Sequence, residues 1–118
     1  MNFLSARGAG DAITVAGRRL QAPTDTLARM AAFTLGIRPE YVQLTDANAT
    51  GALPAVVTQA QDIGTYWLVT AQAGAGPEAS VVRARLSPEQ VIPKVGEAVW
   101  LGVVGEHSCY YVNEELIA

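Results

Sequence analysis

The chain has 118 residues, of which 50% are hydrophobic and 16% charged, a composition that supports one packed domain and excludes a disordered chain. The formal net charge of −3 disfavours nucleic-acid phosphates as partners, and the single cysteine, Cys109, cannot close a disulfide within the chain. Because the sequence has neither a signal-peptide pattern nor an apolar run long enough to span a bilayer, we expect a soluble, cytoplasmic-type domain.

The first part of the chain is expected to consist of short strands. Period-two alternation over Met1–Arg7 predicts a strand that turns Asn2 and every second residue after it to one face. Gly17 separates two further strand-like runs, Ala12–Ala16 and Arg18–Gln21, and glycine suits a tight turn at that position. These patterns predict one strand followed by two more that are joined by a turn.

A brief helix and another strand follow. The side-chain oxygens of residues 24–26 are suited to cap a helix N-terminus, and Leu27, Met30 and Ala31 would then share one helical face. The helix must be short, because the sequence becomes strand-like again over Phe33–Arg38.

This strand ends in a corner that proline stiffens. Gly36 permits either close backbone approach or positive φ, while Pro39 fixes its own φ and keeps Arg38 out of the helical region. Arg38 and Glu40 place opposite charges beside the corner, and Tyr41–Leu44 is expected to be short and extended. We interpret these four corner residues as an interdomain or partner contact, whose charges are ion-pair partners rather than catalytic groups.

The rest of the chain is dominated by strand-like runs that turn residues separate. These runs are Pro54–Gln61, Thr65–Ala71, Ala79–Leu86, Glu97–Val103, Ser108–Val112 and Glu115–Ile117. Residues 73–77 predict a glycine-rich loop tip, and Ser87–Gln90 has the spacing of a capping box for about one helical turn. Turns at roughly 8–12-residue intervals predict an all-β barrel or sandwich of short antiparallel strands, with at most one or two short helical turns.

Residues that commonly carry catalysis or bind metals are sparse. His107 has no second histidine and no cysteine cluster at metal-ligand spacing, which favours a surface histidine. His107 and Cys109 would share one strand face, but no third group is present to orient them, so Cys109 is expected to be a small buried hydrophobe. The adjacent Glu114 and Glu115 suit a solvated tail. No phosphate loop is present, and we assign no catalytic, cofactor-binding or metal-binding residue.

Two aromatic pairs keep a nucleic-acid hypothesis open. Tyr66-Trp67 and Tyr110-Tyr111 lie on expected strands, and in a small barrel such rings can stack on bases. Adjacent strand residues face opposite sides, so one ring of each pair is expected in the core. The acidic balance provides no basic groove for a nucleic-acid backbone, which weakens this hypothesis.

Three stretches of the sequence together resemble one known domain. They are Met1-Asn2-Phe3-Leu4, Leu35-Gly36-Ile37-Arg38-Pro39-Glu40, and the region from Gln61-Asp62-Ile63-Gly64 through Val82-Arg83-Ala84-Arg85-Leu86 to residues 93–101. In order and spacing they are similar to the C-terminal regulatory domain, called TOBE or OB-like, of ATP-binding subunits of ABC importers of the maltose or glycerol-3-phosphate type. The resemblance implies a small OB-like β-barrel.

The resemblance also implies a setting for the domain. Residues 1–118 would form a single regulatory domain, a fragment of a longer subunit whose nucleotide-binding domain precedes it. ATP and Mg²⁺ would bind that upstream domain, so the fragment would hold no cofactor and would not be an enzyme. The implied partners are the nucleotide-binding domain of the same subunit, the second ATPase subunit of a homodimer, the permease subunits, and a regulatory protein or small effector. The subunit would lie in the cytoplasm at the inner face of the plasma membrane.

Three functional hypotheses remain open. The first is a regulatory and dimer-supporting domain for sugar or sugar-phosphate import, with a contact surface at Gly36, Arg38, Pro39 and Glu40. The second is a domain that senses a small ligand, either a sugar or an oxyanion. The third is a barrel that binds single-stranded oligonucleotides.

Overall fold

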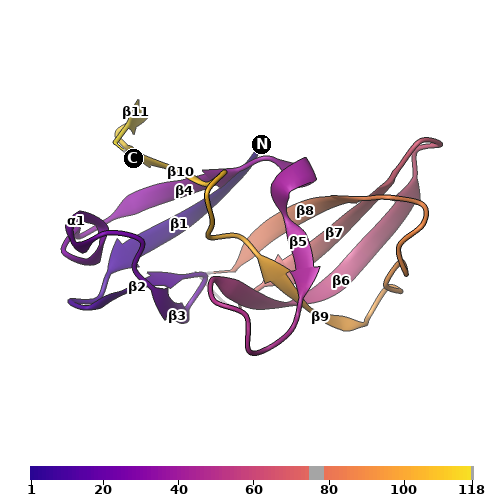
Figure 1. Cartoon of the computed structure of the whole chain (residues 1–118), viewed down its shortest axis with the longest axis horizontal. Helices are drawn as coiled ribbons and strands as arrows, with labels where there is room; N and C mark the ends of the chain where they lie inside the picture. Colours follow the sequence, from indigo (N-terminus) through magenta and orange to yellow (C-terminus); the bar gives the residue numbers. More distant parts are fainter. Residues whose placement is uncertain (75–78, 118) are drawn as a thin grey trace.

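The computed structural model describes residues 1–74 and 79–117. These residues form two antiparallel sheets that lie side by side along the long axis of the molecule, which measures 41 Å (Figure 1). The inner faces of both sheets contribute to one hydrophobic core. The fold is therefore all-β and OB-like, as the sequence predicts, and the helical elements among the described residues are two short turns.

The first sheet, on the left in Figure 1, joins the start of the described chain to its end. Its strands in spatial order are β11 (Glu115–Leu116), β10 (Cys109–Val112), β4 (Phe33–Ile37), β1 (Asn2–Gly8), β2 (Ala12–Val15) and β3 (Arg18–Gln21). Ala16 and Gly17 join β2 to β3, and Asn113 and Glu114 join β10 to β11, all four with positive φ. Positive φ at both central residues gives a turn whose twist matches that of the paired strands.

The second sheet, on the right in Figure 1, is formed by the middle of the chain. Its described strands in spatial order are β5 (Gln43–Thr45), β9 (Ala98–Gly102), β6 (Ala52–Asp62), β7 (Trp67–Ala73) and β8 (Ser80–Leu86). A β-bulge shifts the register of β6 against β7 between Val57 and Gln59. Of the loop tip predicted at residues 73–77, Ala73 belongs to β7, and residues 75–77 lie outside the described residues.

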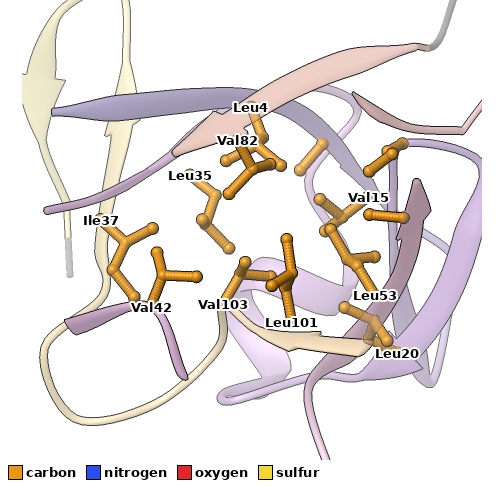
Figure 2. Close-up of a cluster of buried hydrophobic side chains, with 14 of the residues drawn as sticks. Leu4, Val15, Leu20, Leu35, Ile37, Val42, Leu53, Val82, Leu101 and Val103 are labelled. Atoms are coloured by element: carbon orange, nitrogen blue, oxygen red, sulfur yellow. The ribbon is translucent and has the colours of Figure 1, made fainter. Parts of the chain in front are cut away.

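The core lies where the inner faces of the two sheets meet. Leu4 and Leu35 from the first sheet and Leu53, Val82 and Leu101 from the second are each at most 1% exposed. Figure 2 shows these side chains pointing into a common interior. Full burial of one such side chain stabilises a protein by about 1.5–3 kcal/mol, so the shared core holds the sheets together.

One buried polar side chain also joins the two sheets. Asn2 is 4% exposed, and its Nδ2 donates to the carbonyl oxygen of Arg83 while its Oδ1 accepts from the backbone N–H of Arg83, both at 2.8 Å. The side-chain amide therefore pairs with the edge strand β8 as a neighbouring strand would. The alternation predicted for the first strand is confirmed, because Asn2, Leu4 and Ala6 are all buried.

The short helix α1 (Asp25–Ala28) begins where the sequence predicts. The hydroxyl oxygen of Thr24 accepts a hydrogen bond from the backbone N–H of Leu27 at 3.2 Å, which caps the helix. Leu27 is buried as expected. The helix stops after a single turn, however, so Ala31 lies beyond it and is exposed rather than on a shared helical face.

A 3₁₀ turn, η1 (Pro39–Tyr41), corrects another prediction. The extended run expected over Tyr41–Leu44 begins only at Gln43, because the backbone N–H of Tyr41 donates to the carbonyl oxygen of Arg38 at 3.0 Å and closes a turn. Proline at the first position favours this conformation, since its φ is already fixed near the helical value. No helix within the described ranges is long and apolar enough to cross a membrane.

The capping-box pattern at Ser87–Gln90 forms its hydrogen bonds without a helix. The backbone N–H of Ser87 donates to Oε1 of Gln90 at 2.8 Å, and the backbone N–H of Gln90 donates to the carbonyl oxygen of Ser87 at 3.0 Å. The nearby Pro93 has no N–H to donate, and no helix follows the turn. The predicted helical turn is therefore an isolated hydrogen-bonded turn.

Candidate functional site

The predicted corner lies where the chain leaves the first sheet and enters the second. Arg38 is extended, with φ −75° and ψ 147°, as a following proline requires, and Pro39 opens the 3₁₀ turn. Ile37 and Val42, on either side of the corner, are buried together at one end of the core (Figure 2). Arg38 and Glu40 are exposed. The buried side chains of Ile37 and Val42 thus anchor the corner in the core, while its charged residues Arg38 and Glu40 are exposed to solvent.

Gly36 is the point at which two aromatic rings come together. In the register of the first sheet it lies between Phe3 on β1 and Cys109 on β10. A Cβ atom at Gly36 would lie 2.9 Å from Cε2 of Tyr111 and 3.4 Å from Cε1 of Phe3. The φ of Gly36 is not positive. Of the two roles that the sequence left open for this glycine, close approach is therefore the one it fulfils.

The rings above Gly36 form an exposed apolar surface. Phe3 and Tyr111 contact each other edge to face, with ring centroids 6.2 Å apart at 69°, and Phe3 is 60% exposed. Together with Thr34 and Glu114 they line a cavity of about 420 Å³. We call these four residues, together with Gly36 beneath the rings, the aromatic face. The alternation of the first strand indicates that Phe3 points outward, but no local pattern places Tyr111 beside it, because that contact depends on the pairing of β10 with β4.

Arg38 connects the corner to the aromatic face. Partial burial raises the pKa of the Tyr111 hydroxyl, the neighbouring Cys109 adds to the rise, and the positive charge of Arg38 opposes it. Neither Arg38 nor Glu40 forms an ion pair with another residue in the described part of the chain. Arg38 therefore lies near the aromatic face, and neither it nor Glu40 has an ion-pair partner among the described residues.

Comparison of the sequence with protein-family profiles identifies the family of this domain. The sequence profile of the TOBE domain matches residues 35–110, from β4 into β10. The chain belongs to the TOBE domain family. TOBE domains are associated with regulatory or ligand-sensing roles of ABC transporter ATPases. A search of curated proteins found no match to the chain.

The TOBE domain keeps His107 and Cys109 apart, which corrects the prediction that they share a strand face. His107 precedes β10 and stacks on Tyr41, with ring centroids 3.9 Å apart and planes 10° apart, and its Nε2 lies 3.5 Å from a carboxylate oxygen of Glu106. Cys109 is half-buried rather than buried, because in β10 it lies on the face of the sheet opposite the core residue Tyr110. Among the described residues, no three His, Cys, Asp or Glu side chains are grouped closely enough to hold a metal ion.

Of the two aromatic pairs in the TOBE domain, Tyr110-Tyr111 divides between core and outer face, as predicted, whereas Tyr66 and Trp67 are both half-buried. Tyr110 is 4% exposed and packs edge to face on Phe33, whereas Tyr111 lies on the opposite side of the sheet. Trp67 packs against the core, and the guanidinium of Arg85 lies 4.0 Å from the ring centroid of its half-buried neighbour, Tyr66. The rings therefore do not form a row on which successive bases could stack.

Proposed function

We propose that this TOBE domain is a non-catalytic regulatory and dimer-supporting part of the ATP-binding subunit of an ABC importer that takes up sugars or sugar phosphates. The aromatic face carries the proposal, because Phe3 stays 60% exposed beside a cavity of about 420 Å³. A contiguous exposed apolar surface is typical of a protein contact site, whereas scattered apolar residues are not. Membership of the TOBE family supports the ATPase setting.

The surface has the composition of an interface, with an apolar centre and a polar margin. Phe3 and Tyr111 supply rigid rings of the kind that protein interfaces favour at their centre. Arg38 and Glu40 are exposed at the adjoining corner. We expect the second ATPase subunit of a homodimer to cover the rings and to pair with these charges.

The other partners follow from the same setting. The nucleotide-binding domain of the same subunit and the permease subunits would complete the importer at the inner face of the plasma membrane, where a regulatory protein or small effector would act on it. ATP and Mg²⁺ would be held by the nucleotide-binding domain. Within residues 1–74 and 79–117 the longest helix has 4 residues, so this chain offers no helix behind a glycine-rich loop for phosphates.

The transporter setting is tested by the gene that encodes the chain. We expect an ATPase-coding segment upstream in the same reading frame, beside genes for permease subunits and a solute-binding protein. A reading frame that begins at this domain, in the absence of permease genes, contradicts the transporter setting.

Sedimentation equilibrium of the chain tests the contact itself. We expect concentration-dependent self-association that Phe3→Ala weakens by about tenfold, because this change removes an exposed ring without opening the core. Val81→Ala is the matched control, since Val81 is 50% exposed on β8 of the second sheet. A chain that stays monomeric at high concentration contradicts autonomous dimer support, and an equal effect of the control contradicts the assignment to the aromatic face.

A further inference from the structure

A second cavity lies beside the corner and differs in character from the aromatic face. Its volume is about 300 Å³, and its walls include Tyr41, Gln43, Thr45, Thr50, Gly102 and His107. These residues come from η1, from β5 and the loop after it, from the end of β9, and from the loop that leads into β10. We call this cavity the Tyr41 pocket.

Two strands form the floor of the Tyr41 pocket. Gln43 and Thr45 are exposed on the same face of β5, and Gln43 lies opposite Gly102 on β9. A Cβ atom at Gly102 would lie 3.7 Å from the carbonyl oxygen of Gln43 and 3.9 Å from Cγ2 of Thr45, which are ordinary contacts. The absence of a side chain at Gly102 is therefore not required by the backbone, and it leaves the floor open.

Two stacked rings form one wall. The rings of Tyr41 and His107 are nearly parallel, with centroids 3.9 Å apart, and Tyr41 is 41% exposed. The electron-rich face of an aromatic ring attracts the weakly positive C–H groups of a bound molecule. The loop that carries Thr50 is held beside the end of β9 by the next residue, Gly51, whose carbonyl oxygen accepts from the N–H groups of Val103 and Val104 at 3.1 and 3.4 Å. The pocket is thus formed without a ligand.

The polar side chains on the floor of the pocket and on its neighbouring loop are neutral. The amide of Gln43 and the hydroxyls of Thr45 and Thr50 can each donate and accept, and no hydrogen bond to another described residue occupies them. No arginine or lysine is among the described residues that line the pocket. The carboxylate of Glu106 is charged, and the one ionisable base of the wall, His107, already contacts that carboxylate through Nε2 at 3.5 Å. A phosphate or sulfate group would meet the Glu106 carboxylate without an arginine or lysine to balance it, and His107 already faces that carboxylate.

We propose that the Tyr41 pocket binds a small, neutral polyhydroxylated molecule, namely a monosaccharide or a short polyol. Hydroxyl groups match the neutral donors and acceptors, and the C–H face of such a molecule matches the stacked rings. The volume lies at the lower end of the range for ligand pockets, about 300–1,000 Å³, which suits one sugar ring rather than a chain of them. Of the two ligand classes that the sequence left open, the charge of the pocket favours the sugar over the oxyanion.

The position of the pocket links it to the aromatic face. Tyr41 lies in η1, which directly follows the Arg38 corner, and His107 lies two residues before β10, which carries Tyr111. A ligand that touches both rings would hold these two segments together. Binding in the pocket would therefore restrict the movement of β4, which η1 follows, and of β10. These two strands carry Gly36 and Tyr111 of the aromatic face.

Titration of the ¹⁵N-labelled chain with glucose and with glycerol, followed by amide NMR, tests the proposal. We expect saturable shifts at millimolar concentrations that are confined to the segments around Gln43, Thr50, Gly102 and Gly105. Glucose 6-phosphate is the matched anionic probe and should bind about tenfold more weakly than glucose, or not at all. The absence of saturable shifts with both neutral probes, shifts that lie elsewhere, or tighter binding of the phosphorylated probe overturns the proposal.

Three variants locate the binding site. Gly102→Leu fills the floor and should abolish the shifts, and Thr45→Val removes one hydroxyl at nearly constant volume and should weaken binding by about three- to tenfold. Thr14→Val, on β2 of the first sheet, is the matched control and should bind as the parent does. If Gly102→Leu does not fold, Thr45→Val decides, because Thr45 is exposed. Unchanged binding in Thr45→Val together with binding in a folded Gly102→Leu, or equal loss in Thr14→Val, contradicts the site.

This inference goes beyond the proposed dimer support and is independent of it. Sedimentation measures the aromatic face, whereas the titration measures the Tyr41 pocket. A chain that dimerises without binding either neutral probe leaves the proposed function standing and removes the ligand site, and the reverse result does the opposite.

Discussion

Gly36 and Gly102 both lie within strands of this small fold, yet their surroundings are opposite. Neither has a positive φ, so neither is required for its backbone conformation. Above Gly36 the space is filled, since an added Cβ would lie 2.9 Å from the ring of Tyr111. At Gly102, the nearest heavy atom of the described residues to an added Cβ, apart from its chain neighbours, would be 3.7 Å away, and Gly102 lines the Tyr41 pocket.

The difference shows that neighbouring strands decide what a strand glycine does. Gly36 is flanked by Phe3 and by a strand that carries Tyr111, so the missing side chain lets two large rings meet. Gly102 is flanked by Gln43 and Ala52, which leave a gap. Gly36 thus contributes to an exposed apolar surface suited to a protein partner, and Gly102 contributes to an open polar cavity suited to a small molecule.

The largest effect is expected at Asn2, directly before Phe3. Asn2→Ala removes both hydrogen bonds to Arg83 and leaves a partly buried N–H and C=O without these partners, so the free energy of unfolding should fall by about 2–3 kcal/mol. Denaturant unfolding measures this, with the exposed loop variant Asn48→Ala as control. Hydrogen exchange should increase at β1 and β8 before it increases around the Tyr41 pocket. A uniform increase would show that the two regions do not differ in their dependence on this link.

The next largest effect is expected at Gly36. Gly36→Val places a branched side chain where the rings of Tyr111 and Phe3 already lie, so it should destabilise the fold by about 1–3 kcal/mol and separate the rings. Thermal unfolding measures the loss, and tyrosine fluorescence reports the displacement of Tyr111. A variant with parent stability and an unchanged spectrum would mean that the space above Gly36 is not filled.

A smaller effect of opposite sign is expected at Tyr110, on the core side of β10. Its hydroxyl is buried and has no hydrogen-bond partner among the described residues, while the nearby Ser108 hydroxyl donates to the carbonyl oxygen of Val103 at 2.6 Å. Tyr110→Phe removes this unpaired group and should raise the free energy of unfolding by up to about 1 kcal/mol. Tyr66→Phe is the control and should change the free energy of unfolding little, because Tyr66 is only half-buried and its ring, which contacts Arg85, is kept.

The burial of Tyr110 also predicts that the stability of the fold depends on pH. Burial raises the pKa of Tyr110, and Ser108 opposes this only in part. The unfolded chain would therefore lose this proton first, near its usual pKa of about 10, so stability is complete below that pH and declines as the pH rises toward the folded pKa. Tyr110→Phe should decline less over this range. Parallel decline of the two proteins in alkaline unfolding measurements would contradict the burial effect.

The smallest effect is expected at Gly102. Gly102→Ala places a methyl group at ordinary contact distances, so the free energy of unfolding should change by no more than about 0.5 kcal/mol. Thermal unfolding of this variant beside Gly36→Ala compares the two positions directly. A larger loss at Gly102 than at Gly36 would reverse the comparison between them.

Much of the fold is predictable because its determinants are local. Burial of every second residue in β1, the Thr24 cap of α1 and the proline-stiffened corner each depend on residues within a few positions of one another. The predictions that are wrong fail for tertiary reasons. Tyr41 closes a turn instead of extending a strand, and His107 leaves the face of Cys109 to stack on Tyr41.

The candidate site, too, has a part that local sequence predicts and a part that depends on tertiary structure. The sequence identifies Gly36, Arg38, Pro39 and Glu40 as a corner with exposed charges, and whether that corner is a contact stays a prediction. It gives no indication of the aromatic face as a unit or of the Tyr41 pocket. Each of these joins side chains from strands and loops that are distant in the chain.

The amino-acid sequence by itself determines that this chain is an all-β domain of the TOBE type, because alternation, turn residues and motif order act locally or in series along the chain. Only the tertiary structure decides that Tyr111 lies over Gly36 and that Tyr41 meets His107. The physical reason is that period-two patterns specify which face of a strand is buried but not which strand lies beside it. That choice is made when both sheets bury their inner faces in one core, and it positions the two surfaces on which the proposed functions depend.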